Sequence, residues 1–231
     1  MSNNAVFLKH ESYRSTNSYT IGMKRCTIYV VRHGQSEFNL SKITSGHVNP
    51  PLTEKGKMQA QSTKEKLSNI HFDEVFSSDL VRAIDTASII YGRPVPKNQQ
   101  SHNLRERNFG EYDGKPEAHL RQIREANNPH FESLTTEEQW RYAHSPGMES
   151  DHDVSSRFIA ALAEIASNNV GKTILVGAHG GTLRTTLISL GYATPKELPG
   201  GSIHNGGYAE LIYEAGEFQI GAVVGANKIT A

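Results

Sequence analysis

The stretch Cys26-Thr27-Ile28-Tyr29-Val30-Val31 is short, apolar and partly β-branched, and Arg32-His33-Gly34 follows it directly. A run of this kind is typical of a strand that is buried on both faces of a parallel sheet. In open α/β sheets, ligands bind beyond the carboxyl ends of the strands, so this arginine and histidine stand where chemistry is expected. The glycine lets the backbone approach a ligand closely. Taken alone, the tripeptide is equally compatible with a polar strand end that has no catalytic role.

A second stretch repeats this arrangement later in the chain. Thr173–Ala178 is again a short buried strand, and His179-Gly180-Gly181 follows it. Two histidines at the carboxyl ends of two parallel strands would face the same crevice. A single buried histidine is often structural, but the repeated pattern favours a functional site that uses both.

Helices and strands alternate along the rest of the chain. The periodicity predicts helices over residues 53–67 with Thr53 as N-cap, over 79–91, over 182–190, and two or three more between 116 and 169. Strands are predicted over residues 74–77, 208–213 and 218–224, and an irregular segment rich in glycine and proline over 92–115. This alternation predicts a three-layer α/β/α sandwich with a mainly parallel central sheet.

The composition is that of an ordinary globular protein with one large domain. The chain has 231 residues, with 24 basic and 24 acidic side chains, so its formal net charge is zero. This balance argues against binding to nucleic acid or to an anionic membrane surface through bulk charge. Cys26 is the only cysteine, which excludes an intramolecular disulfide and a thiolate metal cluster.

The chain divides into a short tail and a single domain. Residues 1–22 are polar and show no period, so we expect a flexible N-terminal extension, with the domain at 23–231 and a helical insertion around 115–146. The tail has no apolar core before a small-residue cleavage site, and no stretch is apolar enough to span a bilayer. A cytoplasmic location is therefore expected.

Further landmarks follow the first histidine in a fixed order. They are Arg32-His33-Gly34-Gln35-Ser36-Glu37-Phe38-Asn39, Ser45-Gly46, Pro51-Leu52-Thr53-Glu54-Lys55-Gly56, Ser77-Ser78-Asp79-Leu80-Val81-Arg82-Ala83, Leu104-Arg105-Glu106-Arg107-Asn108-Phe109-Gly110, Gly147-Met148-Glu149-Ser150 and His179-Gly180. With these landmarks the chain resembles the histidine phosphatase superfamily, in the branch that includes cofactor-dependent phosphoglycerate mutases and small-molecule phosphatases. The resemblance covers roughly residues 25 to 225. It implies a phosphoglycerate mutase-like sandwich and metal-independent phosphoryl transfer.

The resemblance also assigns roles to individual residues. His33 is expected to be the nucleophile, whose neutral imidazole attacks phosphorus and holds the phosphoryl group. Arg32, Arg82 and His179 are expected to supply positive charge to the phosphoryl oxygens. The remaining phosphate-binding positions are expected at Asn39, Ser45, Gly46 and Gly180. No metal and no other cofactor is expected.

Glu106 is the expected general acid. It would protonate the leaving alkoxide and then activate water against the phosphohistidine. From composition alone, Glu106 would more ordinarily be a surface carboxylate paired with Arg105 or Arg107. The landmark that contains it, residues 104–110, favours the general acid instead. Glu111 is the rival if the register of the motif is shifted.

Two sets of charged residues near position 150 each allow two interpretations. Arg157 and Glu149 either brace the site or belong to a solvated helix face. The run Glu149-Ser150-Asp151-His152-Asp153 contains metal-ligating residue types, but an acidic helix N-terminus explains it better because the helix dipole favours negative charge there.

The acceptor of the phosphoryl group distinguishes a phosphatase from a mutase. Mutases of this family hold a second anionic group with an adjacent Arg-Arg pair in the insertion, whereas residues 115–146 contain only scattered arginines. The insertion is also shorter than expected of a mutase, and Gly181 stands where mutases commonly carry Asn. These departures favour a phosphatase, with a phosphoglycerate mutase as the alternative and a non-catalytic phosphate-binding domain disfavoured.

The sequence indicates the substrate only by class, a small phosphate monoester. Residues expected to line or cover the cleft are Tyr112, His119, Arg121, Arg124, Trp140 and Arg141. Assembly into a homo-oligomer is left open.

Overall fold

The computed structural model describes residues 25–229, so the predicted extension at residues 1–22 lies outside the described part. Its strands are β1 (Cys26–Arg32), β2 (Glu74–Ser78), β3 (Gln100–Ser101), β4 (Thr173–Ala178), β5 (Ile203–Glu214) and β6 (Glu217–Ala226). Its α-helices are α1 (Glu37–Ser41), α2 (Glu54–Lys66), α3 (Val81–Tyr91), α4 (Glu117–Ser133), α5 (Thr136–Arg141), α6 (Asp151–Ser167) and α7 (Gly180–Ser189).

The central sheet has the strand order β3-β2-β4-β1-β5-β6. The neighbours from β3 to β1 pair in parallel, and β5 and β6 add an antiparallel edge. The predicted mainly parallel sheet is therefore confirmed. The carboxyl ends of β1 and β4, which His33 and His179 follow, are in register. Arg32, the last residue of β1, pairs with Ala178, the last residue of β4.

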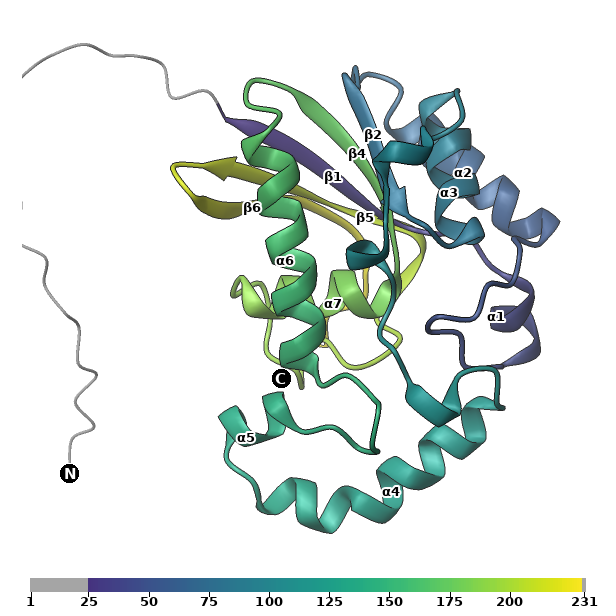
Figure 1. Cartoon of the computed structure of the whole chain (residues 1–231), viewed down its shortest axis with the longest axis vertical. Helices are drawn as coiled ribbons and strands as arrows, with labels where there is room; N and C mark the ends of the chain where they lie inside the picture. Colours follow the sequence, from purple (N-terminus) through teal and green to yellow (C-terminus); the bar gives the residue numbers. More distant parts are fainter. Residues whose placement is uncertain (1–24, 230–231) are drawn as a thin grey trace, which may run out of the picture.

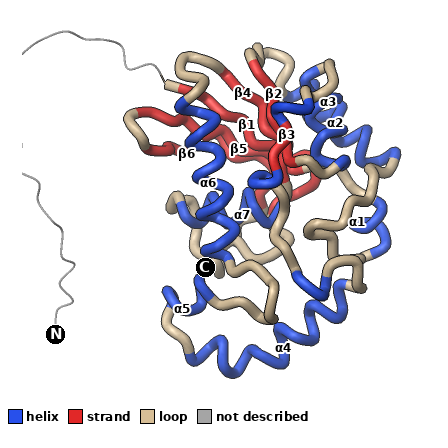
Figure 2. Tube along the Cα trace, viewed as in Figure 1, coloured by secondary structure: helices blue, strands red, loops and turns tan. Residues whose placement is uncertain are grey.

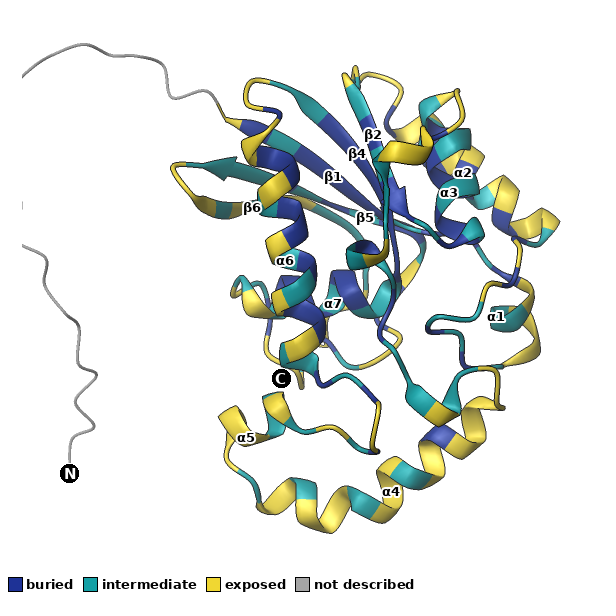
Figure 3. Cartoon of the chain, viewed as in Figure 1, coloured by how far each residue is buried: buried dark blue, intermediate teal, exposed yellow. Residues whose placement is uncertain are grey.

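Helices cover both faces of the sheet, with α6 and α7 on one side and α2 and α3 on the other (Figure 1). Alternate residues of β1 feed two separate cores: Ile28 and Val30 pack with residues of α6 and α7, whereas Tyr29 and Val31 pack with residues of α3. This is the outcome expected of a strand that is apolar on both faces. The buried colour of β1, β4 and the inner helix faces marks the two cores in Figure 3.

The insertion lies at one end of the molecule, beyond the carboxyl ends of the strands, where α4 and α5 form an arch (Figure 1). Leu120 is the only buried residue of α4, and α5 has none. The expectation of two or three helices between 116 and 169 is confirmed by α4, α5 and α6. No helix of the described residues is long and apolar enough to cross a membrane.

The boundaries differ from the predictions at a few places (Figure 2). Helix α1 was not expected, because it is only five residues long, and it depends on a capping box made by Ser36 and Asn39. Helix α3 begins at Val81, two residues later than predicted, since Leu80 still has extended backbone. Helix α7 begins at Gly180, two residues earlier than predicted, with His179 as its N-cap.

Candidate active site

His33 lies directly beyond β1, and its backbone N–H extends the sheet by donating to the Ala178 carbonyl at 3.0 Å. Its ring Nδ1 lies 2.6 Å from the Gly34 carbonyl, which can only accept, so Nδ1 carries the proton and Nε2 is unprotonated. Burial lowers the pKa of His33 well below its ordinary value, and the Arg82 and Arg32 guanidiniums lower it further. The imidazole is therefore neutral at physiological pH, as a nucleophile requires.

Arg82 comes from the first turn of α3 and is completely buried. Its Nε donates to His33 Nε2 at 3.3 Å, and its two terminal nitrogens donate to the carbonyls of Val48 at 2.7 Å, Gly46 at 2.8 Å and Ser45 at 3.1 Å. Burial is the main reason why the pKa of Arg82 falls to about 10, which still leaves it charged. The loop carbonyls thus fix the guanidinium against the nucleophile.

Ser45 and Gly46 take part in the site as supports of Arg82. The N–H of Gly46 donates to the Asp113 carboxylate at 2.6 Å, and Asp113 also accepts from the His47 N–H at 3.0 Å. Ser45 also lines the adjoining cavity. Direct binding of phosphate by either residue stays a prediction.

His179 faces His33 from the end of β4, with the two ring centroids 5.3 Å apart and the planes 66° apart. It is completely buried, and neither ring nitrogen has a hydrogen-bond partner among the described residues. Arg32 Nε is also buried without a partner in the described part of the chain, although a terminal nitrogen of Arg32 donates to the Ile203 carbonyl. Buried polar atoms are normally bonded, so the unbonded nitrogens of His179 and Arg32 beside His33 indicate a place that binds a polar ligand.

The glycines after His179 allow this close grouping. A Cβ at Gly180 would lie 2.9 Å from Arg32 Nε, so a larger residue would displace that guanidinium. Helix α7 starts at Gly180, which places the positive end of its dipole beside the histidine pair.

Glu106 is held by two backbone groups. Its Oε1 accepts from the Arg107 N–H and its Oε2 from the Gly181 N–H, each at 2.8 Å. Neither neighbouring arginine pairs with it: Arg105 binds Asp79 at 2.7 and 2.8 Å, and Arg107 binds Asp151. The surface ion-pair interpretation of Glu106 is therefore wrong.

Glu106 also lines the cavity, whereas Glu111 does not. Glu111 instead lies 3.6 Å from Lys115 at the surface. The structure therefore brings Glu106, and not its rival, to the site.

Arg157 and Glu149 brace the loop that carries Glu106. Arg157 binds the Glu149 carboxylate at 2.9 and 2.8 Å, and donates to the carbonyls of Asn103 at 2.8 Å and Arg105 at 3.0 Å. The bracing interpretation is thus confirmed over the solvated helix face.

Asp151 and Asp153 occupy the first turn of α6, where Ser150 and Asp153 form a capping box. Among residues 25–229 no three or more His, Cys, Asp or Glu side chains are grouped as a metal site would require.

Two supporting residues were missed by the sequence analysis. Thr86 Oγ1 accepts from the Gly34 N–H at 3.1 Å, and its position one helical turn after Arg82 is the signal that could have indicated it. Asn205 donates to the His33 carbonyl at 3.0 Å and lies 3.4 Å from Asn39 Oδ1. No pattern connects Asn205 with the site, because β5 reaches it only through the fold.

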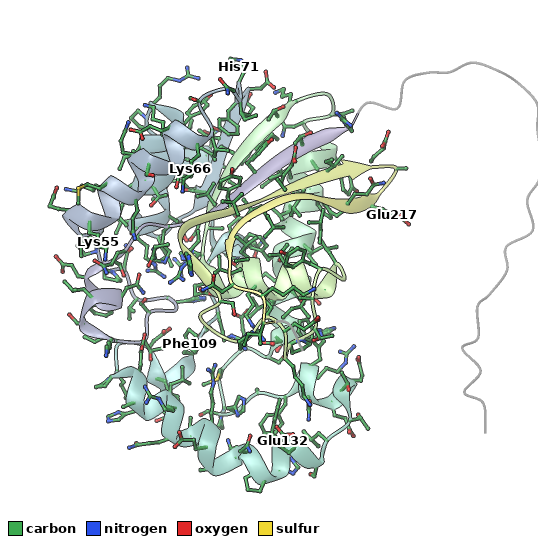
Figure 4. All side chains as sticks on the ribbon, turned by 180° about the vertical axis from the view of Figure 1, so that it is seen from behind. Lys55, Lys66, His71, Phe109, Glu132 and Glu217 are labelled. Atoms are coloured by element: carbon green, nitrogen blue, oxygen red, sulfur yellow. The ribbon has the colours of Figure 1, made fainter. Side chains whose placement is uncertain are left out.

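A cavity of about 1020 Å³ extends from Arg32 and Glu106 to the insertion, and the buried His33, Arg82 and His179 do not line it. Of the predicted site residues, Arg32, Asn39, Ser45, Glu106 and Gly180 line it. Of the predicted cleft residues, Arg121, Arg124 and Trp140 line it, and Tyr112, His119 and Arg141 do not. Phe109 and Glu132, both on its wall, mark its extent from the body of the sandwich to the insertion in Figure 4.

Comparisons with known proteins show which family and relatives the chain is similar to. A family model described as "Histidine phosphatase superfamily (branch 1)" matches residues 28–224. A curated 2,3-bisphosphoglycerate-dependent phosphoglycerate mutase of Gloeobacter violaceus is 32% identical over 74% of this chain and 78% of its own.

Solved structures share the fold. A phosphoglycerate mutase from Bacillus anthracis str. Sterne superposes with a TM-score of 0.74 at 25% identity, covering 88% of this chain and 94% of its own. A phosphoserine phosphatase mutant from Entamoeba histolytica, in complex with phosphoserine, superposes with a TM-score of 0.71 at 23% identity, covering 86% and 96%. The last likeness bears on the fold alone.

Proposed function

The chain belongs to the histidine phosphatase superfamily (branch 1), and from this premise we propose that it is a metal-independent phosphomonoesterase that acts through a phosphohistidine on His33. The observation that carries the proposal is the state of His33: a neutral ring whose unprotonated Nε2 accepts from the buried Arg82, beside unbonded nitrogens of His179 and Arg32. A nucleophile surrounded by fixed donors suits phosphoryl transfer, because catalysis there is mostly positioning and charge stabilisation. The expected substrate is a small phosphorylated metabolite.

The reaction proceeds in two displacements. His33 Nε2 attacks phosphorus as the ester P–O bond breaks, and a protonated Glu106 gives its proton to the leaving oxygen. The Glu106 carboxylate then takes a proton from water, whose oxygen attacks the phosphohistidine and releases inorganic phosphate. The Gly34 carbonyl, bonded to Nδ1–H at 2.6 Å, stabilises the positive charge that the ring acquires.

Trapping tests the intermediate. Labelled phosphate monoester mixed with the enzyme in excess chelator and quenched rapidly is expected to leave an acid-labile, alkali-stable phosphoenzyme. His33→Ala should abolish the label, while His119→Ala, a change at an exposed residue of α4, should retain it. Label that persists in His33→Ala, or activity that depends on a divalent metal, would contradict the proposal.

A phosphoglycerate mutase is the second candidate, favoured by the names of the curated relatives, which are phosphoglycerate mutases. The scattered arginines of the insertion and Gly181 support water as the acceptor instead. The two activities are separated by supplying 3-phosphoglycerate with 2,3-bisphosphoglycerate and measuring both products. We expect release of inorganic phosphate to exceed formation of 2-phosphoglycerate, and the reverse ratio would identify a mutase.

A further inference from the structure

Strand β6 forms one edge of the sheet, because the strand order ends in β1-β5-β6 and no strand of residues 25–229 lies beyond it (Figure 2). One row of its backbone N–H and C=O groups faces β5, and the other row faces away from the sheet. Gln219, Gly221 and Ala222, in the middle of the strand, are exposed. Another strand can therefore reach this edge.

The β6 edge lacks the features by which proteins usually prevent the addition of a strand. Natural sheets end on short strands, on lysine or proline, or on a bulge that twists the edge away. The opposite edge follows this rule, because β3 has only two residues. β6 has ten, and residues 218–226 include no charged side chain and no proline. The left-handed backbone of Gly225 bends the strand only near its end, which leaves residues 217–224 for pairing.

One face of β6 carries a row of apolar side chains. Phe218, Ile220 and Val223 are half-buried and pack against the core beneath α6 and α7. The ring of Phe218 lies 4.8 Å from that of Tyr213 on β5. Because cross-strand apolar pairs stabilise a sheet, a strand with an apolar row of its own would extend this surface. β6 of a second copy is such a strand.

The charges at the two ends of β6 determine the direction of pairing. Glu217 is the first residue of the strand, and Lys228 follows two residues after the last. Lys228 lies 3.5 Å from Glu197 of the same chain and is partly exposed. An antiparallel copy of β6 would bring the acidic end of each strand beside the basic end of the other, at both ends at once. A parallel copy would place like charges together.

We propose that β6 pairs with β6 of a second copy of this chain, antiparallel about a two-fold axis near Gly221, so that the two sheets become one continuous sheet. In such an interface the same surface of each copy meets itself, as two-fold symmetry requires. The pairing brings Glu217 of each copy beside the Lys228 end of the other.

The assembly leaves the catalytic cavity of each copy open. No residue of β6 lines the cavity. Glu217, at the tip of the β5–β6 hairpin, lies on a different side of the molecule from Phe109 and Glu132, which are on the cavity wall (Figure 4). The inference is therefore independent of the proposed phosphatase activity.

Sedimentation velocity of the full chain tests the assembly. The mass should rise from 25.5 kDa toward twice that value as the protein concentration increases from about 1 to about 100 μM, a range that detects a micromolar Kd. A monomer at every concentration in this range would overturn the proposal.

Ala222→Lys should weaken the dimer at least about tenfold, because the two added ammonium groups would lie near each other across the axis and lysine protects natural edges. Met58→Lys is the matched control, since it adds the same charge at an exposed position of α2, and it should keep the dimer. Hydrolysis of a phosphate monoester should be equal in the two variants and the native chain. A dimer that persists in Ala222→Lys contradicts the proposed interface. If the native chain hydrolyses no ester, the phosphatase proposal fails and sedimentation still decides the assembly.

Charge reversal at the two ends tests the antiparallel direction without a change in the middle of the strand. Glu217→Lys and Lys228→Glu each place like charges together at both ends, so each should raise Kd by roughly tenfold, the order expected when two exposed ion pairs change sign. An equimolar mixture of the two variants restores opposite charges at both ends of the mixed dimer and should associate like the native chain. The mixture still contains the loss of the Lys228–Glu197 ion pair, so its recovery reports the contact between copies. Single variants that associate as tightly as the native chain, or a mixture that does not recover, would refute the antiparallel arrangement.

Discussion

At the scale of single residues, Gly181 shows how closely the general acid is fitted to the site. Its N–H donates to Glu106 Oε2 at 2.8 Å, and a Cβ at this position would collide with the Glu106 carboxylate. Glu106 can approach α7 only because no side chain is present there. The glycine that distinguishes this chain from the mutase pattern therefore has a direct effect on where the proton donor lies.

Gly181→Ala is predicted to separate activity from stability. The added methyl group must push the carboxylate away, so kcat for a phosphate monoester should fall by at least about tenfold, since a small misplacement of a catalytic group is costly. Folding should not suffer, because Ala is favoured over Gly in a helix by about 0.5–1 kcal/mol. Steady-state kinetics and the Tm measure the two effects. Gly200→Ala, whose Cβ would meet nothing within 4 Å, should change neither, and full activity in Gly181→Ala would contradict this account of Glu106.

At the scale of elements, α3 positions both Arg82 and the turn that holds His33. Its first turn carries Arg82, and the next turn carries Thr86, whose hydroxyl donates to the Arg82 carbonyl at 2.7 Å and accepts from the Gly34 N–H at 3.1 Å. The Gly34 carbonyl in turn holds the His33 ring. One helix thus sets the position of the guanidinium and of the turn that orients the nucleophile.

A pair of buried threonines tests this function of α3. Thr86→Val leaves the Gly34 N–H without its acceptor, and we expect the free energy of unfolding to fall by about 1–3 kcal/mol, because a buried unpaired donor is costly. We also expect kcat to fall, because the turn that orients His33 loosens. Thr186→Val on α7 is the control: its hydroxyl is equally buried but has no partner in the described chain, so the substitution should be neutral or stabilising. Urea unfolding and kinetics of both variants provide the measurement, and equal losses in the two would refute the assignment.

At the scale of the whole molecule, a chain of zero formal net charge concentrates buried basic groups at one end of its sheet. Burial lowers the pKa values of His33 and His179 well below their ordinary range, and lowers that of His144 to about 4 with help from Arg124 and Arg107. The free energy of unfolding therefore depends on the protonation of histidines at the ligand site.

The coupling has a definite sign. These histidines are neutral in the folded state, whereas in the unfolded chain they take up protons below about pH 6.5, so the unfolded state binds more protons and acid favours unfolding. The free energy of unfolding should therefore fall steadily as the pH is lowered from 7 to 4.5. Paired carboxylates such as Asp79, whose pKa the Arg105 guanidinium lowers, contribute mainly below that window.

His144→Gln isolates one histidine in this profile. It should reduce the loss of unfolding free energy between pH 7 and 4.5 by about 1–2 kcal/mol, a value discounted for the partial exposure of the ring. His119→Gln, at an exposed position of α4, should leave the profile unchanged. Urea titrations at several pH values measure the slope, and an unaltered slope in His144→Gln would show that the ring titrates normally.

The sequence by itself determined the buried strands of the sheet and the two strand ends that His33 and His179 follow. Hydrophobic periodicity and position at a strand end are local properties. It also determined the family, through landmarks that each lie within a few residues of one another. Only the tertiary structure decided that Glu106 and not Glu111 reaches the cleft, that Ser45 and Gly46 support Arg82 through their carbonyls, and that Asn205 anchors the nucleophile.

The ion pairs of Asp151 with Arg107 and Arg184 belong to the same second class. Asp151 starts α6, Arg107 lies in the loop of Glu106 and Arg184 lies on α7, so no spacing in the sequence relates them. They meet because α6, α7 and the loop of Glu106 converge at one end of the sheet. Contacts of this kind depend on packing between distant segments, which a local pattern of residue types does not encode.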